Sequence, residues 1–122
     1  MTEATESSTA TADVSLAGLS KDFTGAAGQL SILRNVDLSL RRGDALAVTG
    51  PSGSGKSTLL YIVGLLDELT GGKIEILGSD PTSMSESELA KFCNEHIGFI
   101  FQDHHLLPQC TVLENVLIPL LA

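Results

Sequence analysis

The sequence has few aromatic residues, few basic residues and no long hydrophobic run, and each shortage excludes a class of protein. Aromatics make up 4% of the 122 residues and tryptophan is absent, so any core must consist of Leu, Ile, Val and Ala. Seven Lys and Arg stand against fifteen Asp and Glu, which gives a net charge of −8. This balance argues against a nucleic-acid binder, which neutralises phosphates with clustered cations. The longest apolar runs, Leu59–Leu66 and Val112–Ala122, are shorter than the roughly 20 residues of a membrane span.

Cysteine is also scarce, and its spacing indicates no site. Cys93 and Cys110 form neither a CxxC pair nor a disulfide framework, which favours a reducing compartment. The start of the chain lacks the basic and apolar stretches of a signal peptide. Its Ser, Thr, Ala and Glu composition predicts a disordered arm over residues 1–12, followed by one incomplete domain over residues 13–122.

The first half of this domain has the alternation of β-strands. Apolar residues alternate with polar ones around Val14–Leu16 and again over Val36–Leu40, and the glycines of Gly25–Gly28 predict a hairpin loop before the second strand. Ala45–Thr49 is apolar without alternation, which is typical of a strand buried on both faces of a parallel sheet.

The second half alternates between helix and strand signals. Lys56–Leu69 has a broad apolar face at helical spacing and is followed by Gly71-Gly72, which we expect to close the helix. Ile74–Leu77 predicts another strand, and Ile97–Phe101 predicts a second buried strand of the parallel core.

Two capping boxes mark the starts of further helices. Ser85 with Glu88 predicts a helix that continues to about Asn94, and Thr111 with Glu114 predicts an apolar helix after it. This last helix runs to the end of the given sequence without a cap, so we expect the natural protein to continue beyond it.

The strongest motif is a glycine-rich loop between the apolar run that ends at Thr49 and the helix that begins at Lys56. Its sequence GPSGSGKST fits the phosphate-loop pattern G-x-x-x-x-G-K-[ST], also called Walker A. Glycines let the backbone wrap closely around phosphates, and the helix adds its free N–H groups and positive dipole end. The predicted nucleotide-binding residues are Gly50, Pro51, Ser52, Gly53, Ser54, Gly55, Lys56, Ser57 and Thr58. The alternative is a Gly/Ser turn that happens to precede a helix.

The last three residues of the loop carry distinct chemistry. The ammonium of Lys56 is placed to reach the β- and γ-phosphates, and we expect it to act in catalysis. The hydroxyl of Ser57 is a ligand for Mg²⁺, and Thr58 is placed to donate near the α-phosphate. The predicted cofactors are therefore ATP and Mg²⁺.

At this point the chain resembles a known family. The loop GPSGSGKST, the preceding VDLSLRRGDALAVTG and the later GFIFQDHHLLPQCTVLENVLIPLL together are similar to the ATP-binding subunits of ABC transporters, over roughly Val14–Leu121. The stretch IGFIFQDHHLLPQCTVLENV resembles the subunits of lipoprotein release, macrolide export and cell division most closely. The resemblance implies an α/β fold, that of a P-loop NTPase, with a truncated parallel core and an N-terminal antiparallel β-subdomain.

The resemblance also implies roles for two residues outside the loop. Phe23 stands where the family places an aromatic, more often Tyr, that stacks on adenine; the alternative is that it packs in the strand hairpin. Gln102 matches the family's glutamine loop, whose side chain reaches Mg²⁺ and the attacking water, so it is a predicted catalytic and metal residue. The alternative for Gln102 is an ordinary solvent-facing loop residue.

The same resemblance implies partners and a location. The Gln102–Thr111 region is expected to contact a membrane permease subunit, and a second ATPase subunit is expected to face the first head to tail. The implied location is cytoplasmic, peripheral on the cytoplasmic face of the inner membrane. The implied function is ATP binding and, in the complete protein, ATP hydrolysis that drives transport or lipoprotein release.

Several family elements do not occur in the sequence. There is no LSGGQ-like signature, no apolar strand ending in Asp-Glu after the loop, and no assignable switch histidine. We therefore expect nucleotide binding but little or no hydrolysis from these residues alone. Two alternatives remain open: a non-catalytic nucleotide-binding fragment, and another P-loop protein such as a small-molecule kinase or a GTPase.

Three weaker candidates have simpler interpretations. His104-His105 lacks zinc-site spacing and an evident third ligand, which favours loop contacts. Asp67-Glu68 is expected to be a solvated helix terminus, and the two cysteines are expected to be inert thiols.

Overall fold

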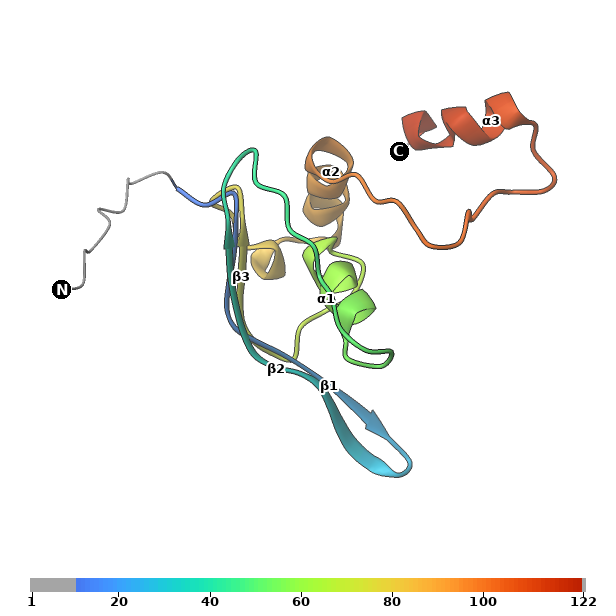
Figure 1. Cartoon of the computed structure of the whole chain (residues 1–122). Coiled ribbons are helices and arrows are strands. Elements are labelled where there is room, and N and C mark those ends of the chain that lie inside the picture. Colours follow the sequence, from blue (N-terminus) through green and yellow to red (C-terminus); the bar gives the residue numbers. More distant parts are fainter. Residues whose placement is uncertain (1–10, 122) are drawn as a thin grey trace.

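The protein, described here by a computed structural model over residues 11–121, consists of a three-stranded sheet with a helix on one face and a C-terminal segment that extends away from it (Figure 1). The elements are β1 (Val14–Gly25), β2 (Gly28–Leu40), α1 (Lys56–Val63), β3 (Gly71–Ile76), the 3₁₀ turn η1 (Pro81–Ser83), α2 (Glu86–His96), α3 (Val112–Leu117) and the 3₁₀ turn η2 (Ile118–Leu121). Residues 1–10 of the predicted arm over residues 1–12 lie outside the described part.

The sheet has the order β2-β1-β3, and both pairings are antiparallel. Leu16 in the central strand pairs with Leu38 of β2 and with Ile74 of β3, so apolar residues of all three strands lie in one row. β1 and β2 meet at Gly25 and Gly28, as the glycines of this loop predicted. The antiparallel N-terminal β-subdomain is thus confirmed.

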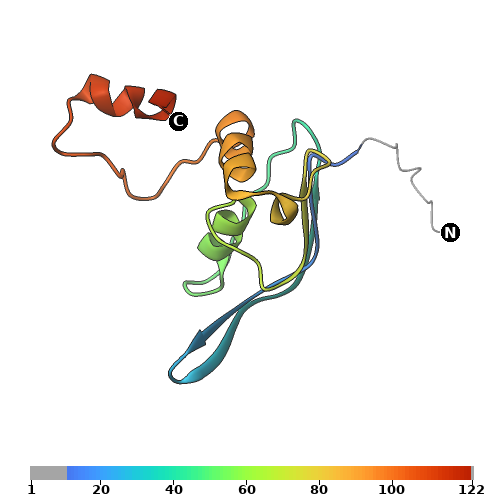
Figure 2. The ribbon, with the colours of Figure 1, turned by 180° about the vertical axis from the view of Figure 1, so that it is seen from behind.

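The core lies between this sheet and α1, which covers one face of it (Figure 2). Leu19 is completely inaccessible to solvent, because it sits in the central strand beneath the helix. Its alternation with polar neighbours gives the strand one apolar face, and α1 contributes one fully buried residue to the same cluster. The buried hydrophobic residues are Leu16, Leu19, Leu33, Ile62, Ile74 and Ile76.

The two segments predicted as parallel strands are not strands. Ala45–Thr49 and Ile97–Phe101 have no ladder hydrogen bonds within residues 11–121, and side chains in both are open to solvent, with Leu46 51% and Ile100 98% exposed. A strand is stable only when a neighbour satisfies its backbone N–H and C=O groups. The prediction was wrong here because apolar content indicates burial but does not supply that neighbour.

The helix after the glycine-rich loop is shorter than predicted. α1 ends at Val63 rather than Leu69, with Gly64 as its C-cap and Leu65 in the left-handed region at φ 59°. Gly71-Gly72 does not close the helix but begins β3. A Cβ on Gly72 would lie 2.3 Å from the carbonyl oxygen of Gly18 in β1, so close strand approach explains this glycine.

Both predicted capping boxes are present. The Ser85 hydroxyl accepts from the N–H of Glu88, whose carboxylate accepts from the N–H of Ser85, and Thr111 and Glu114 repeat the arrangement. α2 continues to His96, two residues beyond the prediction.

Residues 97–121 form the least packed part of the protein. None of them is buried, and in both views the chain runs away from the sheet before it turns into α3 (Figures 1 and 2). Within the described range, no helix has the length and apolarity needed to cross a membrane. The elements that could position a site are therefore the sheet, α1 and the loop before it.

Candidate functional site

The glycine-rich loop Gly50–Gly55 leads directly into α1, and its last residue lies against β2. Gly55 is the N-cap of the helix and is left-handed, with φ 90° and ψ 9°. A Cβ at this position would lie 2.9 Å from Cδ2 of Leu33 and 3.2 Å from the carbonyl oxygen of Ile32. Both the backbone conformation and the close contact require glycine here. The loop is thus held against the sheet by the residue that the motif fixes.

The first turn of α1 has free backbone donors. Gly55 provides no side-chain cap, and among the described residues the N–H groups of Lys56, Ser57 and Thr58 have no acceptor. These groups carry the positive end of the helix dipole. A helix start with free N–H groups after a glycine-rich loop is suited to an anion such as a phosphate.

Lys56 turns back over the loop. Its Nζ donates to the carbonyl oxygen of Gly50 at 2.8 Å and to that of Pro51 at 2.6 Å, and lies 3.4 Å from Oγ of Ser54. The Ser54 hydroxyl also donates to the Pro51 carbonyl at 2.7 Å, which tightens the turn. The ammonium is therefore held on the backbone of the loop that leads into the free amides of α1.

The hydroxyl residues follow in the same helical turn. Ser57 is exposed and Thr58 is half-buried. No group of three or more His, Cys, Asp or Glu side chains is placed to hold a metal in residues 11–121. Mg²⁺ binds through few protein ligands together with phosphate oxygens and water, and Ser57 fits that role. A metal here would thus depend on a bound polyphosphate.

Phe23 lies on β1 near the hairpin, opposite Leu30 of β2. It is 46% exposed, so it is not a core residue. The Nζ of Lys21 lies 5.0 Å from the centre of its ring, within the range of a cation–π contact. Phe23 is thus an accessible aromatic on the hairpin whose second strand contacts Gly55.

Gln102 is exposed and follows a row of aromatic side chains. The ring centres of Tyr61 and Phe99 are 5.7 Å apart, and those of Phe99 and Phe101 are 4.5 Å apart. This row connects α1 to the start of the extended segment. No hydrogen bond joins Gln102 to the glycine-rich loop within residues 11–121. The structure does not bring Gln102 onto the loop.

Sequence reasoning missed an ion pair that connects β1 to the segment after α1. Lys21 is only 7% exposed, and its Nζ donates to Oδ1 of Asp67 at 2.7 Å and to the carbonyl oxygen of Glu68 at 2.5 Å. The hydrogen bond from Lys21 lowers the pKa of the Asp67 carboxyl, and partial burial opposes this effect. Asp67 is thus not part of a solvated helix terminus. The available signal was a lysine at an inward position of a strand.

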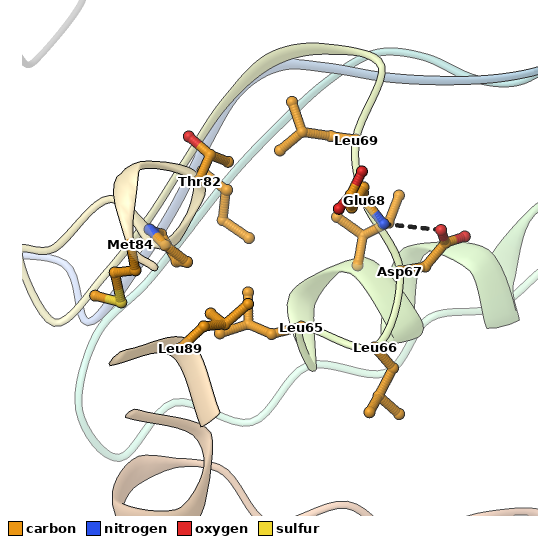
Figure 3. Close-up of a pocket in the computed structure, with 11 residues that line it drawn as sticks. Leu65, Leu66, Asp67, Glu68, Leu69, Thr82, Met84 and Leu89 are labelled. Carbon is orange, nitrogen blue, oxygen red and sulfur yellow. Dashed lines mark hydrogen bonds between the residues drawn. The ribbon is translucent and has the colours of Figure 1, made fainter. Parts of the chain in front are cut away.

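One hollow lies away from the glycine-rich loop. It encloses about 500 Å³ between the turn after α1, β3, η1 and α2, and Figure 3 shows Leu65 and Leu89 next to each other in it. Its lining is mostly apolar, with Asp67, Glu68 and Thr82 as the polar members, and it includes no residue of Gly50–Thr58. Because its lining is mostly apolar and the loop's donors are elsewhere, this hollow is not the predicted site.

The remaining candidates make local contacts. Nδ1 of His104 accepts from the N–H of Leu106 at 3.1 Å, and the His105 ring packs edge-on against Phe101 at 4.6 Å. Cys93 and Cys110 are half-buried free thiols.

Comparisons with known proteins agree with this geometry. The family model described as ABC transporter matches residues 33–120. The lipoprotein-releasing system ATP-binding protein LolD 1 of Rhodopirellula baltica is 56% identical over 85% of this chain and 45% of its own length. LolD of Anaeromyxobacter dehalogenans is 46% identical over 93% of this chain and 47% of its own length. The chain thus spans less than half the length of these relatives.

Solved structures give the same result. The dimeric MJ0796, a bacterial ABC transporter cassette, has a TM-score of 0.83 and 38% identity over 88% of this chain and 47% of its own. Its post-hydrolysis form bound to ADP and phosphate has a TM-score of 0.83 and 39% identity, with the same coverage. The predicted P-loop NTPase fold is thereby confirmed, although the two core segments lack strand partners. The chain therefore belongs to the ABC transporter family and represents part of its ATP-binding cassette.

Proposed function

We propose that this chain binds ATP through Gly50–Thr58 and that, in the complete cassette, it takes part in ATP hydrolysis that drives a membrane transport or lipoprotein-release complex. The proposal rests on two features of one segment. The N–H groups at the start of α1 are free, and the ammonium of Lys56 is folded back onto the glycine-rich loop. Both groups favour a polyphosphate. The names of the relatives, ATP-binding proteins of lipoprotein-releasing systems, support the same function.

Different groups of this segment would contact different parts of the triphosphate. The N–H groups of the first turn of α1 would donate to phosphate oxygens. Lys56 would exchange its hydrogen bonds to the carbonyls of Gly50 and Pro51 for hydrogen bonds to the β- and γ-phosphates. Ser57 would hold Mg²⁺, which neutralises charge between these phosphates. Phosphate binding would thus use groups of one continuous segment, the loop and the first turn of α1.

Two further residues complete the proposed site. Phe23 offers an accessible ring for stacking on adenine. Gln102 would orient the attacking water and contact Mg²⁺, which requires the extended segment to move toward the loop. Such a movement is compatible with the exposure of residues 97–121 and would couple the nucleotide to contacts made by this segment.

Hydrolysis needs groups that the sequence does not contain. The base of the reaction and the second carboxylate ligand of Mg²⁺ would come from an Asp-Glu strand end, and no such strand follows the loop in these 122 residues. The proposed activity of this chain by itself is therefore binding.

Partners follow from the same assignment. We propose that Gln102–Thr111 contacts a membrane permease subunit and that a second ATPase subunit faces this one head to tail. The exposure of this region and the dimeric structure of MJ0796 support this arrangement. The location would then be peripheral, on the cytoplasmic face of the membrane.

A fluorescent ATP titration tests the phosphate loop. We expect Lys56→Ala to weaken binding at least tenfold, because charge-assisted hydrogen bonds contribute about 1.5–3 kcal/mol. Lys73→Ala is the matched control, since it removes one exposed positive charge from β3. Equal affinity of the wild type and Lys56→Ala would contradict the proposal.

A non-catalytic nucleotide-binding role is the second candidate, favoured by the missing Asp-Glu strand. Phosphate release from MgATP by the complete cassette separates the two. Release that Lys56→Ala abolishes would exclude the non-catalytic role, and no release by the complete cassette would exclude the hydrolytic one.

A further inference from the structure

Lys21 is a buried cation next to the exposed aromatic Phe23. Both residues belong to β1, and Lys21 is 7% exposed whereas Phe23 is 46% exposed. Burial of an ammonium is costly unless specific partners compensate it. The partners of Lys21 therefore indicate what this position does.

Three groups surround the ammonium. The Asp67 carboxylate and the Glu68 carbonyl hold it at 2.7 Å and 2.5 Å, and the centre of the Phe23 ring lies 5.0 Å away. Asp67 is itself fixed, because its Oδ1 accepts from the N–H of Glu68 at 2.8 Å (Figure 3). The ammonium thus joins the segment after α1 to an aromatic side chain on the hairpin.

We propose that Lys21 is a positioning residue for nucleotide binding, which holds the Phe23 ring in place for stacking on adenine. This inference rests on the proposed function, in which Phe23 receives the base. The cation occupies one side of the ring, and the exposed fraction of Phe23 leaves another side for the base.

A pre-positioned ring would strengthen binding because less side-chain freedom is lost when the base stacks on it. An exposed aromatic side chain that is free to rotate must be immobilised when a base stacks on it, and this weakens binding. A ring already held by a fixed cation avoids most of that loss. Because Asp67 follows α1 and the phosphate loop precedes α1, the same helix connects the base platform to the phosphate site.

A simpler interpretation is that the Lys21–Asp67 pair only stabilises the fold. The two interpretations differ in what they predict for ligands with and without a base. A purely structural role affects ATP and inorganic tripolyphosphate equally, whereas a positioning role affects ATP alone.

The experiment is calorimetric titration of the full chain with MgATP and, separately, with magnesium tripolyphosphate. We expect Lys21→Met to weaken ATP about three- to tenfold, the effect of losing one pre-ordered side chain. Tripolyphosphate affinity should stay within about twofold, and Lys21→Arg should retain wild-type ATP affinity because it keeps the cation. Lys73→Met is the matched charge control on β3.

A double variant strengthens the test. In a Phe23→Ala background, Lys21→Met should cause no further loss of ATP affinity. Asp67→Asn keeps Lys21 but weakens its anchor, so we expect a smaller, about twofold, loss for ATP alone. This variant tests the inference even where Lys21→Met does not fold, as judged by circular dichroism.

Several results would overturn the inference. These are an equal loss for both ligands, an unchanged ATP affinity in Lys21→Met or in a folded Asp67→Asn, or a further loss in the Phe23→Ala background. If Lys56→Ala abolishes binding while the Lys21 variants bind ATP normally, this inference fails and the proposed function stands. If the wild type binds neither ligand, both fail.

Discussion

The sheet with α1 and the C-terminal segment differ in how completely they are packed. Residues 14–76 contain all the buried hydrophobic residues of the core, whereas none of residues 97–121 is buried. Both regions are rich in apolar side chains and both contain well-formed hydrogen-bonded elements. The difference is that β1 pairs with both β2 and β3, while Ile97–Phe101 has no paired neighbour in the described range. Apolar composition alone therefore does not make a core.

The largest test of this contrast is a pair of leucine truncations. Leu19→Ala should lower the free energy of unfolding by about 2–5 kcal/mol, because it removes methyl groups from a fully buried site. Leu113→Ala in α3, where the side chain is 65% exposed, should change it by about 0.5 kcal/mol or less. Urea denaturation followed by circular dichroism measures both. Similar losses would show that α3 is packed in solution.

Breaking the Lys21–Asp67 pair should give the second largest loss in the free energy of unfolding. Asp67→Ala should destabilise the chain by about 1–3 kcal/mol, because it leaves a nearly buried ammonium short of one partner. Asp67→Asn should cost less, since an amide oxygen can still accept from Lys21.

This pair also predicts a pH dependence. The pKa of Asp67 is lowered by its hydrogen bond with Lys21, so its stabilisation is present above the unfolded pKa, near 3.9, and is lost as pH falls through the lower folded pKa. The stability difference between the wild type and Asp67→Asn should thus be constant from about pH 7 to pH 5 and shrink below about pH 4. Urea denaturation at each pH measures it, and a difference that grows on acidification would contradict the assignment.

The smallest effect comes from the two capping boxes. Ser85→Ala should cost about 1 kcal/mol of global stability, because α2 adjoins the core through Phe92. Thr111→Ala should reduce helicity without shifting the main unfolding transition, because α3 has no buried residue. Hydrogen exchange of the two helices distinguishes local from global loss.

Local features of the fold were largely predictable. The hairpin at Gly25–Gly28 and both capping boxes depend on residues close in sequence, and the structure has them where the patterns indicated. Features that depend on distant partners were not predictable in this way. The missing strand pairing of Ile97–Phe101 is one example, since its apolar run is local but a pairing neighbour is not.

The candidate site also contains both locally determined features and features that depend on distant partners. The glycine spacing identified Gly50–Thr58, and the close approach of Gly55 to Leu33 explains why this glycine is needed. The contact of Lys21 with Asp67 joins residues 46 positions apart, which no local pattern indicates. The roles of Phe23 and Gln102 remain predictions that rest on family resemblance and on their exposed positions.

The sequence by itself determined the phosphate-loop motif, the antiparallel hairpin and the helix caps, because each depends on the chemistry of neighbouring residues. Only the tertiary structure decided which apolar segments became core. It also placed the buried ammonium of Lys21 next to the exposed ring of Phe23. The physical reason is that burial and strand pairing require a partner, and a partner far along the chain is defined by the fold and not by local sequence.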